Sequence, residues 1–184
     1  DVDAAEIVER FHRPVLAELA RRGTPFRGAL YAGLMLTADG PRLLEFNARF
    51  GDPETQVVLA LLETPLAGLL RAAATGTLAD HPPLRWRAGY AVTVVLAALG
   101  YPGHPRGGDV LTGADLPGVL HAGTRRRDDG AVVSAGGRVV DVVAIGDTLA
   151  AARDSAYALL GKIHLDGGHF RTDIAGTPQL GRSV

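Results

Sequence analysis

A carboxylate and an amide lie two residues apart at the end of a short apolar stretch, where Leu43 and Leu44 precede Glu45, Phe46 and Asn47. If this stretch is a strand, its side chains alternate between two faces, so Glu45 and Asn47 share one face. Leu44 and Phe46 then point the other way. A carboxylate and an amide oxygen suit a hard cation such as magnesium, which keeps several waters and is usually completed by substrate phosphates. The pair therefore predicts a metal site for a phosphate-bearing substrate.

Charges of both signs follow this strand in a turn-forming stretch that contains Arg49, Gly51, Asp52, Pro53 and Glu54. A guanidinium can hold a phosphate or a carboxylate with a planar fork of hydrogen bonds. Together with the metal pair, the turn indicates a phosphoryl-transfer site. The competing interpretation is a solvated strand face followed by a surface ion-pair cluster, because short motifs recur by chance and exposed ion pairs are common.

The complete string LLEFNARFGDPETQ, from Leu43 to Gln56, resembles the ATP-grasp ligases, and within them the C-terminal part of the phosphoribosylamine-glycine ligase family. Further segments resemble that family in the same order: FRGALYAGLMLTADG before the Glu-Phe-Asn, then GYPG at Gly100–Gly103, GD at Gly108 and Asp109, HAGT at His121–Thr124 and GGRVV at Gly136–Val140. The series covers nearly the whole chain. Only residues 1–20 and the last dozen resemble the family weakly.

The resemblance implies an α+β fold in two parts. Residues 1–80 would be the C-terminal part of an ATP-grasp lobe, an antiparallel sheet with helices, and residues 81–184 a small C-terminal α+β domain. The Gly76 and Pro82-Pro83 stretch marks that boundary, or else an ordinary turn. The family also has N-terminal domains with a lysine and a flexible lid over the nucleotide, which this chain lacks, so the fragment alone is expected to be inactive.

The resemblance also assigns ligands. Glu45 and Asn47 match the positions that hold Mg²⁺, or Mn²⁺, on the β- and γ-phosphates of ATP. Met35 and Leu44 are similar to the apolar residues against which adenine packs, although ordinary core positions would look the same. Many ATP-grasp members carry a further acidic ligand on the preceding strand. The corresponding place here is near Ala32, which cannot coordinate a metal, and this departure fits the glycine ligase branch.

The reaction implied by the resemblance belongs to purine biosynthesis. ATP would phosphorylate the carboxylate of glycine, and the nitrogen of 5-phosphoribosylamine would then attack the glycyl phosphate and release phosphate. Arg49 would stabilise the transferring phosphoryl group, and Asp52 or Glu54 would hold the glycine ammonium group. Gly136 and Gly137 would let backbone amides approach a substrate phosphate, with Arg138 adding charge. Gly107-Gly108 and Gly136-Gly137 can also be read as plain hairpin turns.

Two other functions remain open. One is another ATP-grasp carboxylate-amine ligase or a carboxylase subunit, although the turn after the strand should then not read RFGDPETQ. The other is a non-catalytic binding domain of the same shape. Intact Glu45, Asn47 and Arg49 argue against that alternative, because a decayed site would be free to lose them.

Composition limits the partners. The 184 residues carry 19 basic and 20 acidic side chains, for a net charge of −1, so no nucleic-acid or membrane-surface partner is expected. The absence of cysteine excludes disulfides and thiolate metal sites. No apolar run approaches membrane-spanning length, and a cytoplasmic location is the default expectation.

Periodicity predicts the elements that position these residues. A helix is expected from about Ala4 to Arg22, with Pro14 as a possible kink and Gly23 as its stop. The other expected elements are strands at 27–37 and 41–47 joined by Ala38-Asp39-Gly40, helices at 56–63 and 66–74, and strands at 90–98, 118–124, 131–134 and 138–145. A last helix capped by Asp147 or Thr148 would pack through one face, formed by Leu149, Ala152, Ala156, Leu159 and Ile163.

Overall fold

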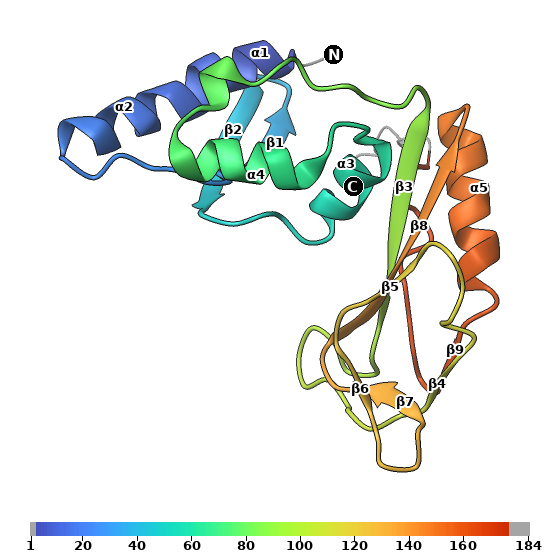
Figure 1. Ribbon diagram of the computed structural model, residues 1–184. Helices are drawn as coiled ribbons and strands as arrows, with labels where there is room; N and C mark the ends of the chain where they lie inside the picture. The colour runs from blue at the N-terminus through green and yellow to red at the C-terminus, as the bar shows by residue number, and fades with distance from the viewer. Residues whose placement is uncertain (1–2, 177–184) are drawn as a thin grey trace. The chain divides into compact units, whose positions relative to one another are not determined.

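The computed structural model describes residues 3–176, which form two compact units (Figure 1). The first unit contains the described residues up to Asp52 together with Thr64–Arg85, and the second contains Pro53–Glu63 together with the described residues from Trp86 onward. Both units combine helices with antiparallel strands, so the predicted α+β fold class is confirmed. The division at residues 80 and 81 stays a prediction about domains. The compact units differ from it by assigning Pro53–Glu63 to the second part and residues 81–85 to the first.

The first unit begins with one continuous helical segment, as predicted. It consists of α1 (Ala4–Ile7), the π-helical turn η1 (Val8–His12) and α2 (Arg13–Arg21), and the Asp3 side chain caps its start by accepting from Ala5 N at 2.9 Å. Pro14 has no N–H to donate, and the turn before it widens, so that Arg13 N donates to Val8 O, five residues back. The helix thereby passes the proline without ending.

A hairpin of β1 (Tyr31–Thr37) and β2 (Gly40–Asn47) follows. The Asp-Gly signal identified its turn correctly, because Gly40 has a φ of 95°, which favours glycine. β1 starts at Tyr31, four residues later than expected. The register pairs Gly33 with Glu45 but Leu34 with Leu43, so Leu44 is the extra residue of a β-bulge. Helix α4 (Leu66–Thr75) and the short 3₁₀ helix η2 (Leu78–Asp80) complete the unit.

The second unit is built on a sheet of three antiparallel strands in the order β3–β8–β5 (Figure 1). These are β3 (Tyr90–Ala97), β8 (Arg138–Gly146) and β5 (Val119–His121). Helix α5 (Leu149–Leu160) packs along β3 and β8, and α3 (Glu54–Leu61) also contacts both strands. The chain must therefore travel 40 residues beyond β3 before it supplies the central strand.

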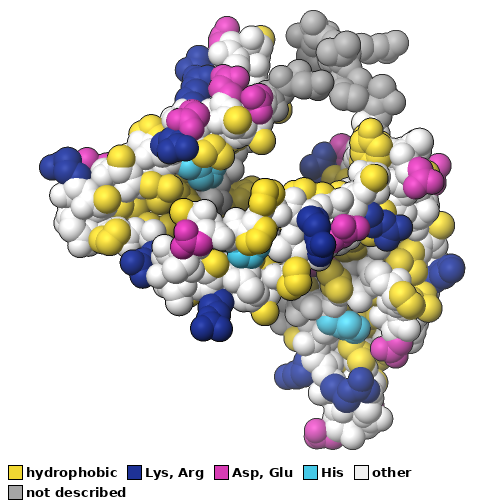
Figure 2. Space-filling view, turned by 45° about the horizontal axis from the view of Figure 1, so that its top comes forward, with side chains coloured by type: hydrophobic (Ala, Val, Ile, Leu, Met, Phe, Trp, Pro, Cys, Tyr) yellow, Lys and Arg dark blue, Asp and Glu magenta, His cyan; other side chains and the backbone are white. Residues whose placement is uncertain are grey.

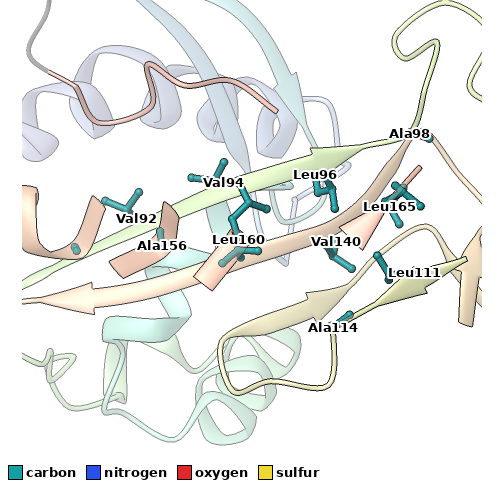
Figure 3. Close-up of a cluster of buried hydrophobic side chains, with 13 residues drawn as sticks. Val92, Val94, Leu96, Ala98, Leu111, Ala114, Val140, Ala156, Leu160 and Leu165 are labelled. Carbon is teal, nitrogen blue, oxygen red and sulfur yellow. The ribbon is translucent and has the colours of Figure 1, made fainter. Parts of the chain in front are cut away.

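The core lies between this sheet and α5. Figure 3 shows Val92, Val94 and Leu96 of β3 and Val140 of β8 on the side of Ala156 and Leu160 of α5. Fully burying one valine side chain contributes about 1.5 to 3 kcal/mol. The predicted face of α5 is confirmed at Ala152 and Ala156, which are completely buried, but Leu149 is 44% exposed and Leu160 takes the buried place at the other end.

Short strand pairs form the far end of this unit. β6 (Thr124–Arg126) pairs with β7 (Val132–Ser134), and β4 (Leu111–Thr112) pairs with β9 (His164–Leu165). The single strand predicted over 118–124 is wrong, because β5 and β6 belong to different sheets. The chain changes sheets at Gly123, where an added Cβ would approach Arg138 O to 2.6 Å.

On the face shown in Figure 2, Lys and Arg side chains are interspersed with Asp and Glu side chains.

Within residues 3–176, no helix has both the length and the apolar character that a membrane span requires.

The N-terminal cap of α5 gives a stability prediction. Thr148 Oγ1 accepts a hydrogen bond from Ala151 N at 3.1 Å, which identifies Thr148 and not Asp147 as the capping residue. Thr148→Ala should lower the free energy of unfolding by about 1 kcal/mol, because a helix amide loses its partner. Chemical denaturation of the chain measures the change. Thr148→Ser keeps the cap and is the control, and a stable Thr148→Ala variant would contradict the assignment.

Candidate metal and phosphate site

Glu45 and Asn47 lie side by side at the end of β2. Asn47 Nδ2 donates a hydrogen bond to Glu45 Oε1 at 2.8 Å, as expected for two side chains on the same face of a strand. Glu45 is exposed and Asn47 is half-buried. A cation coordinated by both side chains would compete with this hydrogen bond, so the pair is close enough to bind one ion but must rearrange to do so.

The neighbouring strand determines what else faces the pair. Gly33 is the partner of Glu45 and Tyr31 is the partner of Asn47, whereas Ala32 pairs with Phe46. The residue that faces Glu45 is therefore a glycine. A Cβ at Gly33 would come within 3.2 Å of Glu45 Cγ, so the glycine leaves room for the carboxylate side chain.

The donor set fits magnesium. Among the described residues, no group of three or more His, Cys, Asp or Glu side chains is placed to hold a metal. A cation at Glu45 and Asn47 would therefore have one carboxylate and one amide oxygen from this chain and would rely on phosphate oxygens and water for the rest. Mg²⁺ is commonly bound in this way, through one or two carboxylates and substrate phosphates.

The opposite face of β2 packs against the first helical segment. The rings of His12 and Phe46 meet edge to face, with their centroids 6.0 Å apart. This contact lies in the π-helical turn, and His12 Nδ1 is buried there without a hydrogen-bond partner. Phe46 therefore packs against the helical segment on one face of β2, and Glu45 and Asn47 carry the candidate ligand atoms on the other face.

The predicted adenine-packing residues are exposed on the same hairpin. Met35 is 53% exposed and Leu44 is 65% exposed. Met35 lies two residues after Gly33, so it shares the strand face of Glu45. Leu44 occupies the bulge, which interrupts the alternation assumed from the sequence. Both side chains are therefore accessible to a ligand.

The charged turn is divided between the two units. Arg49 is exposed, and one of its terminal nitrogens donates to Phe50 O at 2.8 Å. Asp52 is half-buried and ends the first segment of unit one. Glu54 is exposed and is the first residue of α3 in unit two. The structure thus brings Glu45 and Asn47 together, while the three charged residues of the turn lie on either side of the division.

A buried acid that the sequence analysis missed anchors α3. Gln56 Nε2 donates to Asp141 Oδ2 at 3.0 Å, and Asp141 is only 2% exposed in the middle of β8. Burying a carboxylate is costly, and a hydrogen bond to a charged group offsets about 1.5 to 3 kcal/mol of that cost. Asp141 is the single acid of β8 and stands among the apolar residues that follow Arg138, which is the signal that could have identified it.

The Gly136-Gly137 pair is not a hairpin turn. It connects β7 to β8, which belong to different sheets, so that interpretation is wrong. A Cβ at Gly137 would overlap the ring of Tyr101, and one at Gly123 would come within 2.8 Å of Gly136 Cα. Close chain packing therefore accounts for both glycines. Arg138, the next residue, is half-buried at the start of β8.

Gly107-Gly108 is not a hairpin turn either. The pair precedes β4, whose partner is the distant β9, and Gly108 N donates to Ser134 O at 2.7 Å. Both glycine pairs line one open pocket of about 460 Å³, together with Arg125 and Ser134.

Two family models match most of the chain. Residues 2–55 match the ATP-grasp (A) domain of phosphoribosylglycinamide synthetase, and residues 91–177 match its C domain. The strand with Glu45 and Asn47 is therefore part of an ATP-grasp domain. Both models describe one enzyme family, in the same order along the chain. The chain belongs to the phosphoribosylglycinamide synthetase family, as the sequence resemblance predicted.

Curated relatives agree with this assignment. The chain is 65% identical over 169 residues to a phosphoribosylamine-glycine ligase of Mycobacterium bovis, with 92% of this chain and 40% of that protein aligned. The corresponding ligase of Streptomyces coelicolor is 60% identical over 178 residues, which cover 92% of this chain and 42% of that protein. The chain thus spans about two fifths of the length of these relatives.

Solved structures resemble the fold. The phosphoribosylamine-glycine ligase of Thermotoga maritima superposes with a TM-score of 0.82 at 35% identity, covering 94% of this chain and 44% of that one. The biotin carboxylase domain of the Hydrogenobacter thermophilus 2-oxoglutarate carboxylase, solved with MgADP, ADP and bicarbonate, reaches a TM-score of 0.50 at 14% identity. It covers 92% of this chain and 38% of that one, and it shows a shared fold alone.

A variant at Gly33 tests whether the space beside the Glu45 side chain matters for metal binding. Gly33→Ala would crowd Glu45, so the affinity of the full-length protein for Mn²⁺ in the presence of nucleotide should fall several-fold. Paramagnetic resonance of Mn²⁺ measures the affinity. Gly68→Ala is the matched control, because a Cβ there meets nothing within 4 Å. Equal Mn²⁺ affinity in both variants would show that the space at Gly33 does not matter for the metal.

Proposed function

We propose that this chain is the C-terminal portion of a phosphoribosylamine-glycine ligase and supplies that enzyme's metal-binding strand. The full-length enzyme would join glycine to 5-phosphoribosylamine with cleavage of ATP, in purine biosynthesis. The observation that carries the proposal is the hydrogen-bonded Glu45 and Asn47 pair within an ATP-grasp domain match. Membership of the family supports this reaction over that of another carboxylate-amine ligase or a carboxylase.

The nucleotide would bind at the β1–β2 hairpin. Glu45 and Asn47 would hold Mg²⁺, or Mn²⁺, whose charge neutralises the phosphates of ATP. Met35 and Leu44 would pack against adenine, which accounts for two large apolar side chains being exposed on the hairpin. The N-terminal domains of the full-length enzyme would supply the rest of the nucleotide site, so this fragment alone would be inactive.

The charged turn would act on the reacting groups. Arg49, two residues beyond Asn47, would stabilise the charge of the transferring phosphoryl group with its planar fork. Asp52 or Glu54 would hold the ammonium group of glycine and so orient its carboxylate for phosphorylation. Phosphoribosylamine nitrogen would then attack the glycyl phosphate, with phosphate as the leaving group.

The second unit would contribute to the site of the amine substrate. Gly136 and Gly137 would bring backbone close to the substrate, and Arg138 would supply a positive charge. The partners in this proposal are the small molecules glycine, 5-phosphoribosylamine and ATP, without nucleic acid or membrane. A cytoplasmic location belongs to the same proposal.

The metal pair gives the first test. Glu45→Gln or Asn47→Ala in the full-length protein should lower ligation turnover by about a hundredfold or more, because each removes a charge-stabilising contact. Thermal melting should stay unchanged, since Glu45 is exposed and Asn47 only half-buried. Glu6→Gln, an exposed acid on α1, is the control. Near-normal turnover in either site variant would exclude the pair as metal ligands.

Arg49 gives a second test, based on geometry at constant charge. Arg49→Lys replaces a fork with a point charge, so kcat should fall about tenfold while the KM for ATP changes little. Steady-state kinetics of the full-length enzyme separate the two constants. Arg71→Lys, an exposed residue of α4, is the matched control. A rise in KM at constant kcat would instead make Arg49 a ground-state binding residue.

A further inference from the structure

Helix α3, which follows the charged turn, has little stability of its own. It comprises eight residues, and none of the eight that the structure describes there is buried. Pro53 occupies its N-cap position, and a proline side chain has no atom that could accept a hydrogen bond from a helix amide. Isolated helices shorter than about 12 to 15 residues are marginal in water, so contacts with the rest of unit two must hold α3 in place.

Contacts at both ends hold α3 within unit two. At its C-terminal end, Arg87 N donates a hydrogen bond to Leu61 O at 2.8 Å. In its first turn, Gln56 Nε2 donates to Asp141 Oδ2 of β8 at 3.0 Å. The C-terminal end is thus held by backbone pairing, whereas a side-chain hydrogen bond holds the start, which is the end joined to the charged turn.

Asp141 accepts this hydrogen bond in apolar surroundings. It is only 2% exposed, and both residues that pair with it across the sheet, Val95 of β3 and Leu120 of β5, are apolar. Replacing a buried polar pair by apolar side chains of similar volume often leaves stability unchanged or higher, so stability alone does not account for an acid here. A hydrogen bond has a preferred direction that an apolar contact lacks, and it can therefore fix one orientation of the helix.

The hydrogen bond determines which way the first turn of α3 faces. Side chains two positions apart on an α-helix point about 200° apart, so a Gln56 directed at β8 leaves Glu54 directed away from the sheet. Glu54 is exposed, as this geometry requires. Without the hydrogen bond the first turn would be free to rotate about the helix axis, and the direction of Glu54 would change with it.

We propose that Gln56 and Asp141 are positioning residues for the step that uses glycine. Their hydrogen bond fixes the start of α3, so that the acid of the charged turn meets the ammonium group of glycine. This inference rests on the function proposed above, in which Asp52 or Glu54 holds that group. Gln56 and Asp141 act through the first turn of α3 and do not touch the substrate.

Loss of the hydrogen bond should affect glycine more than ATP. The residues proposed to bind the metal of ATP, Glu45 and Asn47, belong to β2 of unit one, whereas the hydrogen bond lies within unit two. The KM values for glycine and for ATP therefore separate a positioning role at the charged turn from general damage to the enzyme.

Steady-state kinetics of the full-length enzyme measure both constants. Gln56→Leu removes the donor and Gln56→Glu sets two acids against each other, so each should raise the KM for glycine about tenfold and change that for ATP less than about twofold. Asp141→Asn keeps an oxygen acceptor and should change the KM for glycine less than about threefold. Gln56→Glu combined with Asp141→Asn exchanges donor and acceptor, so it should restore the KM for glycine to within about threefold of the unmodified enzyme. If Gln56→Leu does not fold, Gln56→Asn, whose amide is one methylene shorter, takes its place.

Val142→Ala is the matched control for a loss of stability. Val142 is fully buried directly after Asp141 in β8, but it shares the strand face of Val140, which packs on the side of α5. The control should lower the melting temperature without changing the KM for glycine. An equal rise of that KM in the control and in Gln56→Leu would overturn the proposal. A combined variant as impaired as Gln56→Glu alone would overturn it too.

Hydrogen exchange of the full-length protein separates this inference from the proposed function. Amides of α3 should exchange at least about tenfold faster in Gln56→Leu, whereas those of α5 should keep their rates. An enzyme that ligates glycine with an unchanged KM for glycine in both Gln56 variants would overturn the positioning role alone. A protein that never ligates glycine would overturn the proposed function, and faster exchange confined to α3 would still identify the hydrogen bond as the anchor of the turn.

Discussion

The antiparallel register of β1 and β2 is the constraint on which the candidate site depends. It sets Gly33 opposite Glu45 and Tyr31 opposite Asn47, so the carboxylate and the amide share a face with room for both. A shift of one residue would turn both oxygen donors to the other face, where Phe46 packs on His12. The Gly40 turn closes one end of the pairing, and the Leu44 bulge shifts the register inside it, between the pairs Gly33–Glu45 and Leu34–Leu43.

The hydrogen bond between Gln56 and Asp141 anchors the second half of the RFGDPETQ string. The RFGDPETQ string starts in one compact unit and continues into α3 of the other. The Gln56 hydrogen bond to buried Asp141 ties α3 to the central strand β8, which also begins at Arg138. The central strand therefore positions the helix that follows the charged turn.

Much of this arrangement could be predicted from short stretches of the sequence. The Asp39-Gly40 turn, the apolar run of β3 and the shared face of Glu45 and Asn47 follow from turn chemistry and period-two alternation. The bulge at Leu44, the separation of β5 from β6 and the exposure of Leu149 could not be read from the sequence, because pairing between distant segments decides them. β8 lies between β3 and β5 although 40 residues separate it from β3. Asp141 was visible as a lone acid within a strand, but only packing shows that it is buried and accepts a hydrogen bond from Gln56.

We propose that Glu45 and Asn47 together bind the metal that accompanies ATP. Anomalous diffraction from crystals of the full-length protein, grown with Mn²⁺ and a non-hydrolysable ATP analogue, tests it most directly. We expect a Mn²⁺ peak within about 2.0 to 2.3 Å of an oxygen of Glu45 and an oxygen of Asn47, in contact with the analogue's phosphates. A peak on the phosphates that touches neither side chain would contradict it.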